Sequence, residues 1–137
     1  MLMLTLDHSR QLAKKFHLDL VVIFGSHASG KLWKHSDLDI AVMGKNPLEP
    51  EQWDSAMIQI MRLSKCNKVD LIDLKRQRGV LLNFQIMTKG KCLYEYQKGF
   101  FREKQMEAIW KYWDFKPMLA DSDRALDYQL TFLEHAR

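Results

Sequence analysis

Cysteine and long apolar runs are both scarce in this 137-residue chain. Its two cysteines, Cys66 and Cys92, lie far apart and form no C-x-x-C motif, which argues against a disulfide framework and predicts two reduced, buried thiols. No apolar run approaches the roughly 20 residues that a membrane-spanning helix requires. The first residues, MLMLTLDHSR, are apolar only at their start and are too short for a signal peptide. We therefore expect a cytoplasmic protein with no membrane contact.

The sequence also lacks the motifs of serine hydrolases and zinc proteins. Ser26 and His27 are adjacent, but no G-x-S-x-G elbow surrounds them, and neighbouring side chains rarely face each other as a nucleophile and its base must. The five histidines and two cysteines show no zinc-ligand spacing. These absences exclude a serine hydrolase pair and leave a zinc site without support.

The charge excess is small, with a net charge of +4. It lies within residues 1–97, because residues 98–137 carry equal numbers of basic and acidic side chains. Such an excess is too small for a general nucleic-acid binder, so no stable binding of nucleic acid is expected. A compact polyanion such as a nucleoside triphosphate would suit it equally well.

Apolar runs alternate with amphipathic stretches through the first part of the chain. Short β-branched and apolar runs predict strands at 18–24, 37–43, 69–74 and 91–96. Helical spacing of apolar residues predicts helices at 8–17, from Pro50 onward and at 79–90. The pattern indicates an α/β or α+β fold with a small mixed, twisted sheet of about four strands and flanking helices.

The character of the sequence changes after Gly99. Apolar residues recur there at helical spacing, at Met106, Ile109, Trp110 and Trp113. A second helix is expected from about Ser122, after Pro117. No flexible linker separates this helical hairpin from the rest, so residues 98–137 are expected to be a C-terminal extension of the domain formed by residues 1–97.

The first helix of this extension is rich in aromatic residues, namely Trp110, Tyr112, Trp113 and Phe115. They fall on more than one face of a helix. One interpretation is that they pack the extension onto the sheet. The other is that they form a partner-binding surface, because aromatic residues are enriched in the centres of interfaces.

Two aspartates stand at the start of the expected strand 37–43. Asp37 and Asp39 would project to the same side of that strand, with Cα atoms about 6.5–7 Å apart. Two like charges at this spacing repel each other and would raise the pKa of at least one carboxyl group. A divalent cation removes this problem, and carboxylate oxygens on one rigid face are ligands that Mg²⁺ prefers.

A third carboxylate would complete a site for two metal ions about 3.5–4 Å apart, which suits phosphoryl or nucleotidyl transfer. The strand VDLIDL supplies Asp70 and Asp73 on opposite faces, so only one of them can join the cluster. Ahead of the pair, Gly25 and Ser26 end the first strand, and such a turn offers backbone N–H groups and a hydroxyl to an anion.

The joint pattern GS-x10-D-L-D followed by VDLIDL resembles the nucleotidyltransferase superfamily of DNA polymerase beta. Within that superfamily, the size of the chain and the sequence SDLDIAV resemble the minimal nucleotidyltransferase (MNT) proteins. The resemblance covers about residues 15–96 and implies a polymerase beta-like nucleotidyltransferase fold for residues 1–97. MNT proteins are commonly the antitoxin partners of HEPN-domain toxins.

The resemblance also implies roles for particular residues. Gly25 and Ser26 would hold the triphosphate, and Asp37 and Asp39 would bind two Mg²⁺ ions. A third acidic residue would bind the catalytic metal and help to deprotonate the attacking hydroxyl. Asp70 is preferred for this role because the third carboxylate of the family usually opens the apolar stretch, while Asp73 stays the alternative.

One position departs from the family pattern. Many members carry an arginine where this chain has Ser29. The corresponding phosphate contact is then either absent or supplied by basic residues elsewhere, of which the candidates are Lys31, Lys34, Lys75, Arg76 and Arg78.

Two functions follow from the resemblance. The first is Mg²⁺-dependent transfer of AMP from ATP to a tyrosine of a HEPN ribonuclease toxin, which would silence the toxin and make this protein its antitoxin, in a hetero-oligomer with it. The second is an antitoxin that neutralises the toxin by binding alone. The full set of Ser26, Asp37, Asp39 and Asp70 favours the enzyme, whereas the size of the chain weakens a third idea, addition of nucleotides to RNA.

Overall fold

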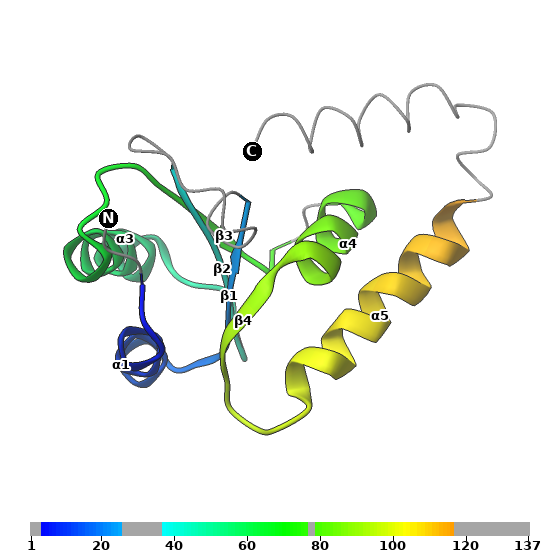
Figure 1. The fold of residues 1–137 in the computed structure, drawn as a ribbon, viewed down its shortest axis with the longest axis horizontal. Coiled ribbons are helices and arrows are strands. Elements are labelled where there is room, and N and C mark those ends of the chain that lie inside the picture. Colours follow the sequence, from blue (N-terminus) through cyan, green and yellow to red (C-terminus); the bar gives the residue numbers. More distant parts are fainter. Residues whose placement is uncertain (1–3, 26–36, 77–78, 117–137) are drawn as a thin grey trace.

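A single mixed sheet forms the centre of the protein. The computed structural model describes residues 4–25, 37–76 and 79–116, which Figure 1 draws as coloured ribbon. The strands are β1 (Leu18–Phe24), β2 (Leu38–Gly44), β3 (Val69–Asp73) and β4 (Lys91–Glu95). Their order is β3-β2-β1-β4, with β1 antiparallel to β2 and β4 and with β2 parallel to β3. The predicted four-stranded mixed sheet is confirmed.

Helices cover both faces of this sheet. They are α1 (Leu6–Phe16), α3 (Pro50–Ser64), α4 (Val80–Lys89) and α5 (Phe100–Phe115). Figure 1 shows α1 and α3 on one face of the sheet and α4 and α5 on the other. The expected α+β class is therefore confirmed, with element bounds within a few residues of the predicted ones. No helix in the described part of the chain is long and apolar enough to cross a membrane.

The central strand β1 contributes to a separate hydrophobic core on each face. Val21 and Ile23 pack in the cluster beneath α1 and α3, whereas Leu20 and Val22 pack in the cluster beneath α4 and α5. All four side chains are at most 1% exposed. Burying an aliphatic side chain of this size stabilises the fold by about 1.5–3 kcal/mol. The prediction that this strand is buried on both faces is confirmed.

Local side-chain contacts and one glycine fix the ends of the helices. At the start of α1, the Thr5 hydroxyl accepts a hydrogen bond from the His8 backbone N–H (3.1 Å) and the His8 ring accepts one from the Thr5 N–H (3.2 Å), which satisfies two otherwise free donors. At the end of α4, a Cβ on Gly90 would clash with the Ile86 carbonyl and lie 2.5 Å from Val22 Cγ1. Only glycine lets α4 end directly on β1.

The chain returns from β4 into α5 through a turn that Glu95 holds. Its carboxylate accepts hydrogen bonds from the backbone N–H groups of Gly99 (3.1 Å) and Phe101 (3.0 Å). Negative charge at the start of a helix is favourable because the first N–H groups carry partial positive charge. Helix α5 then packs against α4. The expected second helix from about Ser122, and with it the hairpin, lies outside the described residues.

Asp73 joins two loops at the end of β3. It is 1% exposed, and its two carboxylate oxygens accept hydrogen bonds from the backbone N–H groups of Leu48 (2.7 Å) and Lys75 (2.9 Å). The Arg76 guanidinium in turn donates to the Leu48 carbonyl (2.7 Å). The loop that follows β3 is thereby fastened to the loop that precedes α3.

This arrangement predicts that Asp73→Asn destabilises the protein. The amide NH₂ would replace one acceptor and face a backbone N–H, so the free energy of unfolding should fall by about 1–3 kcal/mol. Asp70→Asn is the matched control on the same strand. Asp70 is exposed, so its substitution should change stability by no more than about 0.5 kcal/mol. Urea denaturation measures both, and a fully stable Asp73→Asn would contradict the structural role of this carboxylate.

Candidate functional site

Asp39 and Asp70 lie side by side on neighbouring strands. They are register partners in the parallel pair of β2 and β3, whose backbones lie about 4.8 Å apart. Ile40 and Leu71, the next residues on each strand, belong to the core beneath α1 and α3. Because side chains alternate along a strand, both carboxylates project from the opposite face, which α4 and α5 partly cover. Asp39 is 2% exposed and Asp70 is exposed.

Asp37 stands just outside this pair. The sheet hydrogen bonding of β2 starts at Leu38, whose N–H donates to the Lys68 carbonyl (2.9 Å), so Asp37 precedes the strand and is exposed. The sequence prediction placed Asp37 within the strand, on the same side as Asp39. The structure thus brings Asp39 and Asp70 together and leaves Asp37 at the solvent-facing start of β2.

The side chains of Asp37, Asp39 and Asp70 fit a divalent cation only in part. Among the residues that the structure describes, no group of three or more Asp, Glu, His or Cys side chains is arranged to hold a metal ion. The Asp39–Asp70 pair nevertheless offers carboxylate oxygens from two rigid strands, which is the ligand chemistry of Mg²⁺. A cation there would also offset the repulsion between a buried carboxylate and its neighbour.

The glycine–serine turn starts at the same end of the strands as the Asp39–Asp70 pair. Phe24 is the register partner of Asp39, and Gly25 follows it with a φ of 73°, a left-handed conformation that favours glycine. The remaining nucleotide-binding candidates, Ser26, Lys31 and Lys34, lie outside the described residues.

The basic residues after β3 lie at the other end of that strand. Leu74 is four residues beyond Asp70, a separation of about 13 Å at 3.3 Å per residue. Arg76 is engaged with the Leu48 carbonyl, and Arg78 lies outside the described residues. Lys75 and Arg76 are therefore poorly placed to replace the missing arginine beside the carboxylate pair.

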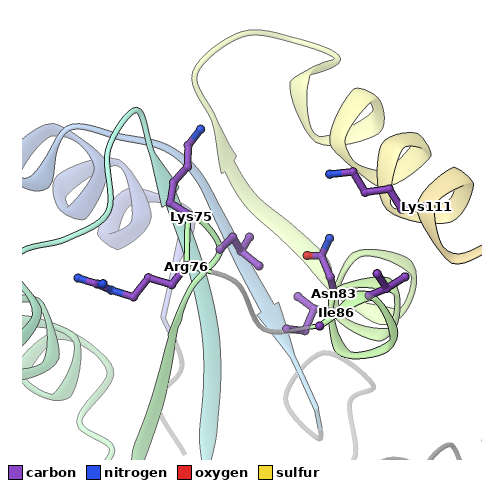
Figure 2. Close-up of a pocket in the computed structure, with 8 residues that line it drawn as sticks. Lys75, Arg76, Asn83, Ile86 and Lys111 are labelled. Atoms are coloured by element: carbon purple, nitrogen blue, oxygen red, sulfur yellow. The ribbon is translucent and has the colours of Figure 1, made fainter. Parts of the chain in front are cut away.

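A cavity of about 540 Å³ opens at this far end. It lies between the end of β3, the start of α4 and the C-terminal half of α5 (Figure 2). Its lining residues are Leu74, Lys75, Arg76, Gly79, Val80, Asn83, Ile86 and Lys111. Sequence reasoning had singled out Lys75 and Arg76 but neither Asn83 nor Lys111, because only the packing of α5 on α4 brings these two together.

The aromatic residues of α5 divide into one buried ring and several exposed ones. Tyr112 is 7% exposed and stacks on Phe84 of α4, with ring centroids 4.1 Å apart. Trp110 and Trp113 are 66% and 57% exposed. Tyr112 therefore packs the helix onto the domain, as the first of the two interpretations has it, whereas neither indole belongs to the core of the described residues.

The two cysteines are free thiols, and Cys92 lacks the environment of a reactive one. Both are free and half-buried, as predicted for reduced thiols, although less deeply than expected. Burial and the nearby Glu95 carboxylate raise the pKa of the Cys92 thiol to about 11. Cys92 is therefore protonated at neutral pH, and thiols in that form are weak nucleophiles.

Known proteins resemble this chain in sequence and in fold. Over 82 residues the chain is 35% identical to a protein adenylyltransferase, MntA, of Shewanella oneidensis, an alignment that covers 59% of this chain and 57% of that relative. A toxin–antitoxin structure with AMP-PNP matches 91% of this chain and 98% of its own, with a TM-score of 0.72 and 24% identity. A complex of tri-AMPylated S. oneidensis HEPN toxin with MNT antitoxin matches 91% of this chain and 95% of its own, with a TM-score of 0.65 and 22% identity.

The structural matches establish a shared fold, and a family comparison adds the evidence from sequence. Residues 9–99 match the model of the family described as polymerase beta, nucleotidyltransferase. This range contains the turn at Gly25, the Asp39–Asp70 pair and all four strands of the sheet. The chain therefore belongs to the polymerase beta nucleotidyltransferase family.

Proposed function

We propose that this protein transfers AMP from ATP to a tyrosine hydroxyl of a HEPN-domain toxin, and that it acts as the antitoxin of that toxin. The observation that carries the proposal is the pairing of Asp39 with Asp70 at the edge where the glycine–serine turn begins. Support comes from the matching relative, which is named a protein adenylyltransferase. The similar complexes that contain AMP-PNP or a tri-AMPylated HEPN toxin support the same nucleotide and acceptor, and transfer of more than one AMP.

The binding roles are those that the resemblance to the family implies. Gly25 and Ser26, with Lys31 or Lys34, would hold the triphosphate at the end of β1. Asp37, Asp39 and Asp70 would hold Mg²⁺, which when bound neutralises phosphate charge and polarises the phosphoryl oxygens. Burial of Asp39 fixes its position in the sheet, which keeps the nucleotide in one orientation.

The chemical step would be an in-line displacement at the α-phosphorus. The tyrosine oxygen forms a bond to the α-phosphorus of ATP while the bond to the β-phosphate oxygen breaks, and pyrophosphate leaves. Asp70 is the candidate base for the tyrosine proton, because it is exposed and can meet an acceptor that arrives from solvent. Asp73 is occupied by two backbone N–H groups on the other face, which supports Asp70 over Asp73.

An antitoxin that acts by binding alone is the alternative. The exposed indoles of Trp110 and Trp113 favour it, because they offer a contact surface that does not depend on the carboxylates. The two functions are separable by experiment, since one requires Asp39 and Asp70 and the other does not.

Substitution of the carboxylates tests the catalytic proposal. Asp37→Asn, Asp39→Asn and Asp70→Asn should each reduce AMP transfer from labelled ATP to purified HEPN toxin by at least about 100-fold. Chelation of Mg²⁺ should have the same effect. Without metal, Asp39→Asn should be at least as stable as the unmodified protein, because like-charge repulsion is relieved.

The matched control is Asp54→Asn, an exposed carboxylate of α3 on the other face, which should transfer AMP at the unmodified rate. Normal transfer by the Asp37→Asn/Asp39→Asn double variant would refute the enzyme. Normal neutralisation of the toxin by a variant without transfer activity would instead support the binding antitoxin.

A second prediction concerns the indoles. Trp110→Ala and Trp113→Ala should each weaken toxin binding by about 30-fold or more, the effect of losing an interface anchor worth about 2 kcal/mol. Their melting temperatures should match that of the unmodified protein, because both indoles are exposed. Tyr112→Ala is the contrasting variant, since removing a buried aromatic ring costs about 3–5 kcal/mol of stability. Thermal melts and pull-downs measure these effects, and a large drop in melting temperature for the tryptophan variants would place both indoles in a core.

A further inference from the structure

The cavity between β3, α4 and α5 has basic and amide side chains that the first AMP transfer does not use. In Figure 2 the Lys111 side chain reaches from α5 toward the loop after β3 that carries Lys75, and the Asn83 amide points into the same gap. Arg76 points away from the gap, because its guanidinium is bound to the Leu48 carbonyl. Lys111 and Asn83 therefore point into the cavity from α5 and α4, and Lys75 lines it from the loop after β3.

The electrostatic environment of this cavity favours an anion. None of the described residues that line it is acidic. Helix α4 also begins here, at Gly79 and Val80, and its N-cap residue Gly79 has no side chain that could cap the first N–H groups. The positive end of a helix adds to the potential of nearby lysines. A phosphate group is the ligand chemistry that this combination fits.

The shape and the remaining lining residues point to a phosphate attached to a nucleoside. The side chains of Leu74, Val80 and Ile86 supply an apolar wall against which a base can pack. The Asn83 amide carries both donors and an acceptor for the edge of a base. The volume of about 540 Å³ lies within the range of about 300–1,000 Å³ that is usual for small-ligand sites.

The cavity lies on the same face of the sheet as the carboxylate pair. Asp70, Ile72 and Leu74 alternate along β3, and both Ile72 and Leu74 pack in the cluster beneath α4 and α5. Asp70 thus lies at one end of this row of three residues, and Leu74, in the cavity wall, lies at the other end, about 13 Å away. A nucleotide in the cavity and ATP at the carboxylates would be different molecules lying along one strand.

We propose that this cavity binds an AMP unit that is already joined to the acceptor, and so retains the modified acceptor for a further transfer. The inference rests on the proposed AMP transfer. In the further step, a ribose hydroxyl oxygen of the AMP-bearing acceptor bonds to the α-phosphorus of a new ATP, the bond to pyrophosphate breaks, and the proton passes to Asp70. Lys75 and Lys111 hold the phosphate of the earlier AMP and take no part in the bond changes.

Binding of free AMP tests the ligand of the cavity without any transfer. In the absence of metal, Lys111→Ala should weaken AMP binding by about tenfold or more, the effect of losing one charge-assisted hydrogen bond. Arg102→Ala is the matched control, an exposed basic residue of the same helix that does not line the cavity. Equal affinity of the Lys111 and Arg102 variants would overturn the assignment.

The number of AMP units per acceptor tests the role of the cavity. With HEPN toxin and ATP, mass spectrometry should show that Lys111→Ala attaches the first AMP normally but the second at least about tenfold more slowly, whereas Arg102→Ala gives the unmodified product distribution. An unchanged distribution in Lys111→Ala, or a single AMP as the final product of the unmodified protein, would overturn the inference. Failure of the unmodified protein to attach even one AMP would instead refute the proposed function, and the AMP-binding measurement would still decide the ligand of the cavity.

Discussion

The in-register parallel pairing of β2 with β3 determines which carboxylates of the candidate site lie together. Because Asp39 pairs with Asp70, the two carboxylates share a face, and Asp73 falls on the other face, where backbone N–H groups bind it. If β3 slipped by one residue against β2, every side chain of β3 would move to the opposite face of the sheet. Asp70 would then point toward the core beneath α1 and α3, and the row from Asp70 to the cavity would be lost. The register is protected by burial on both faces, since Leu71 and Ile72 each occupy a different core.

Much of this architecture could be predicted from local sequence. The four apolar runs gave the strands because β-branched residues bounded by glycine and polar residues form buried strands, and alternation alone put Asp70 and Asp73 on opposite faces. Local pattern could not say which of them lies beside Asp39, because that depends on the register of β2 and β3, two strands joined through α3. The preference for Asp70 came from family resemblance. The position of Asp37 outside β2 was also missed, because the hydrogen bond from Leu38 to Lys68 that starts the strand is a long-range contact.

In the helical extension, too, a long-range contact decides what local sequence could not predict. Helical periodicity indicated that the aromatic residues of α5 occupy several faces, but the choice of the buried face is made by α4. Phe84 selects Tyr112 as its stacking partner, which turns Trp110 and Trp113 toward solvent in the described part of the chain. The same packing brings Lys111 opposite β3 and Asn83. No spacing in the sequence connects residues 75, 83 and 111, so the cavity could be found only in three dimensions.

The attachment of Leu48 to the end of β3 means that the position of Lys75 in the cavity can change without a change in the carboxylate pair. Leu48 donates its N–H to Asp73 and accepts from Arg76 through its carbonyl, so the loop before α3 acts as a brace for the loop that carries Lys75. A change in the length or packing of that brace would shift Lys75 relative to Lys111, while the strand pairing would keep Asp39 and Asp70 in place. On the proposed retention of the modified acceptor in the cavity, variation at this loop would alter how many AMP groups are added without altering the first transfer.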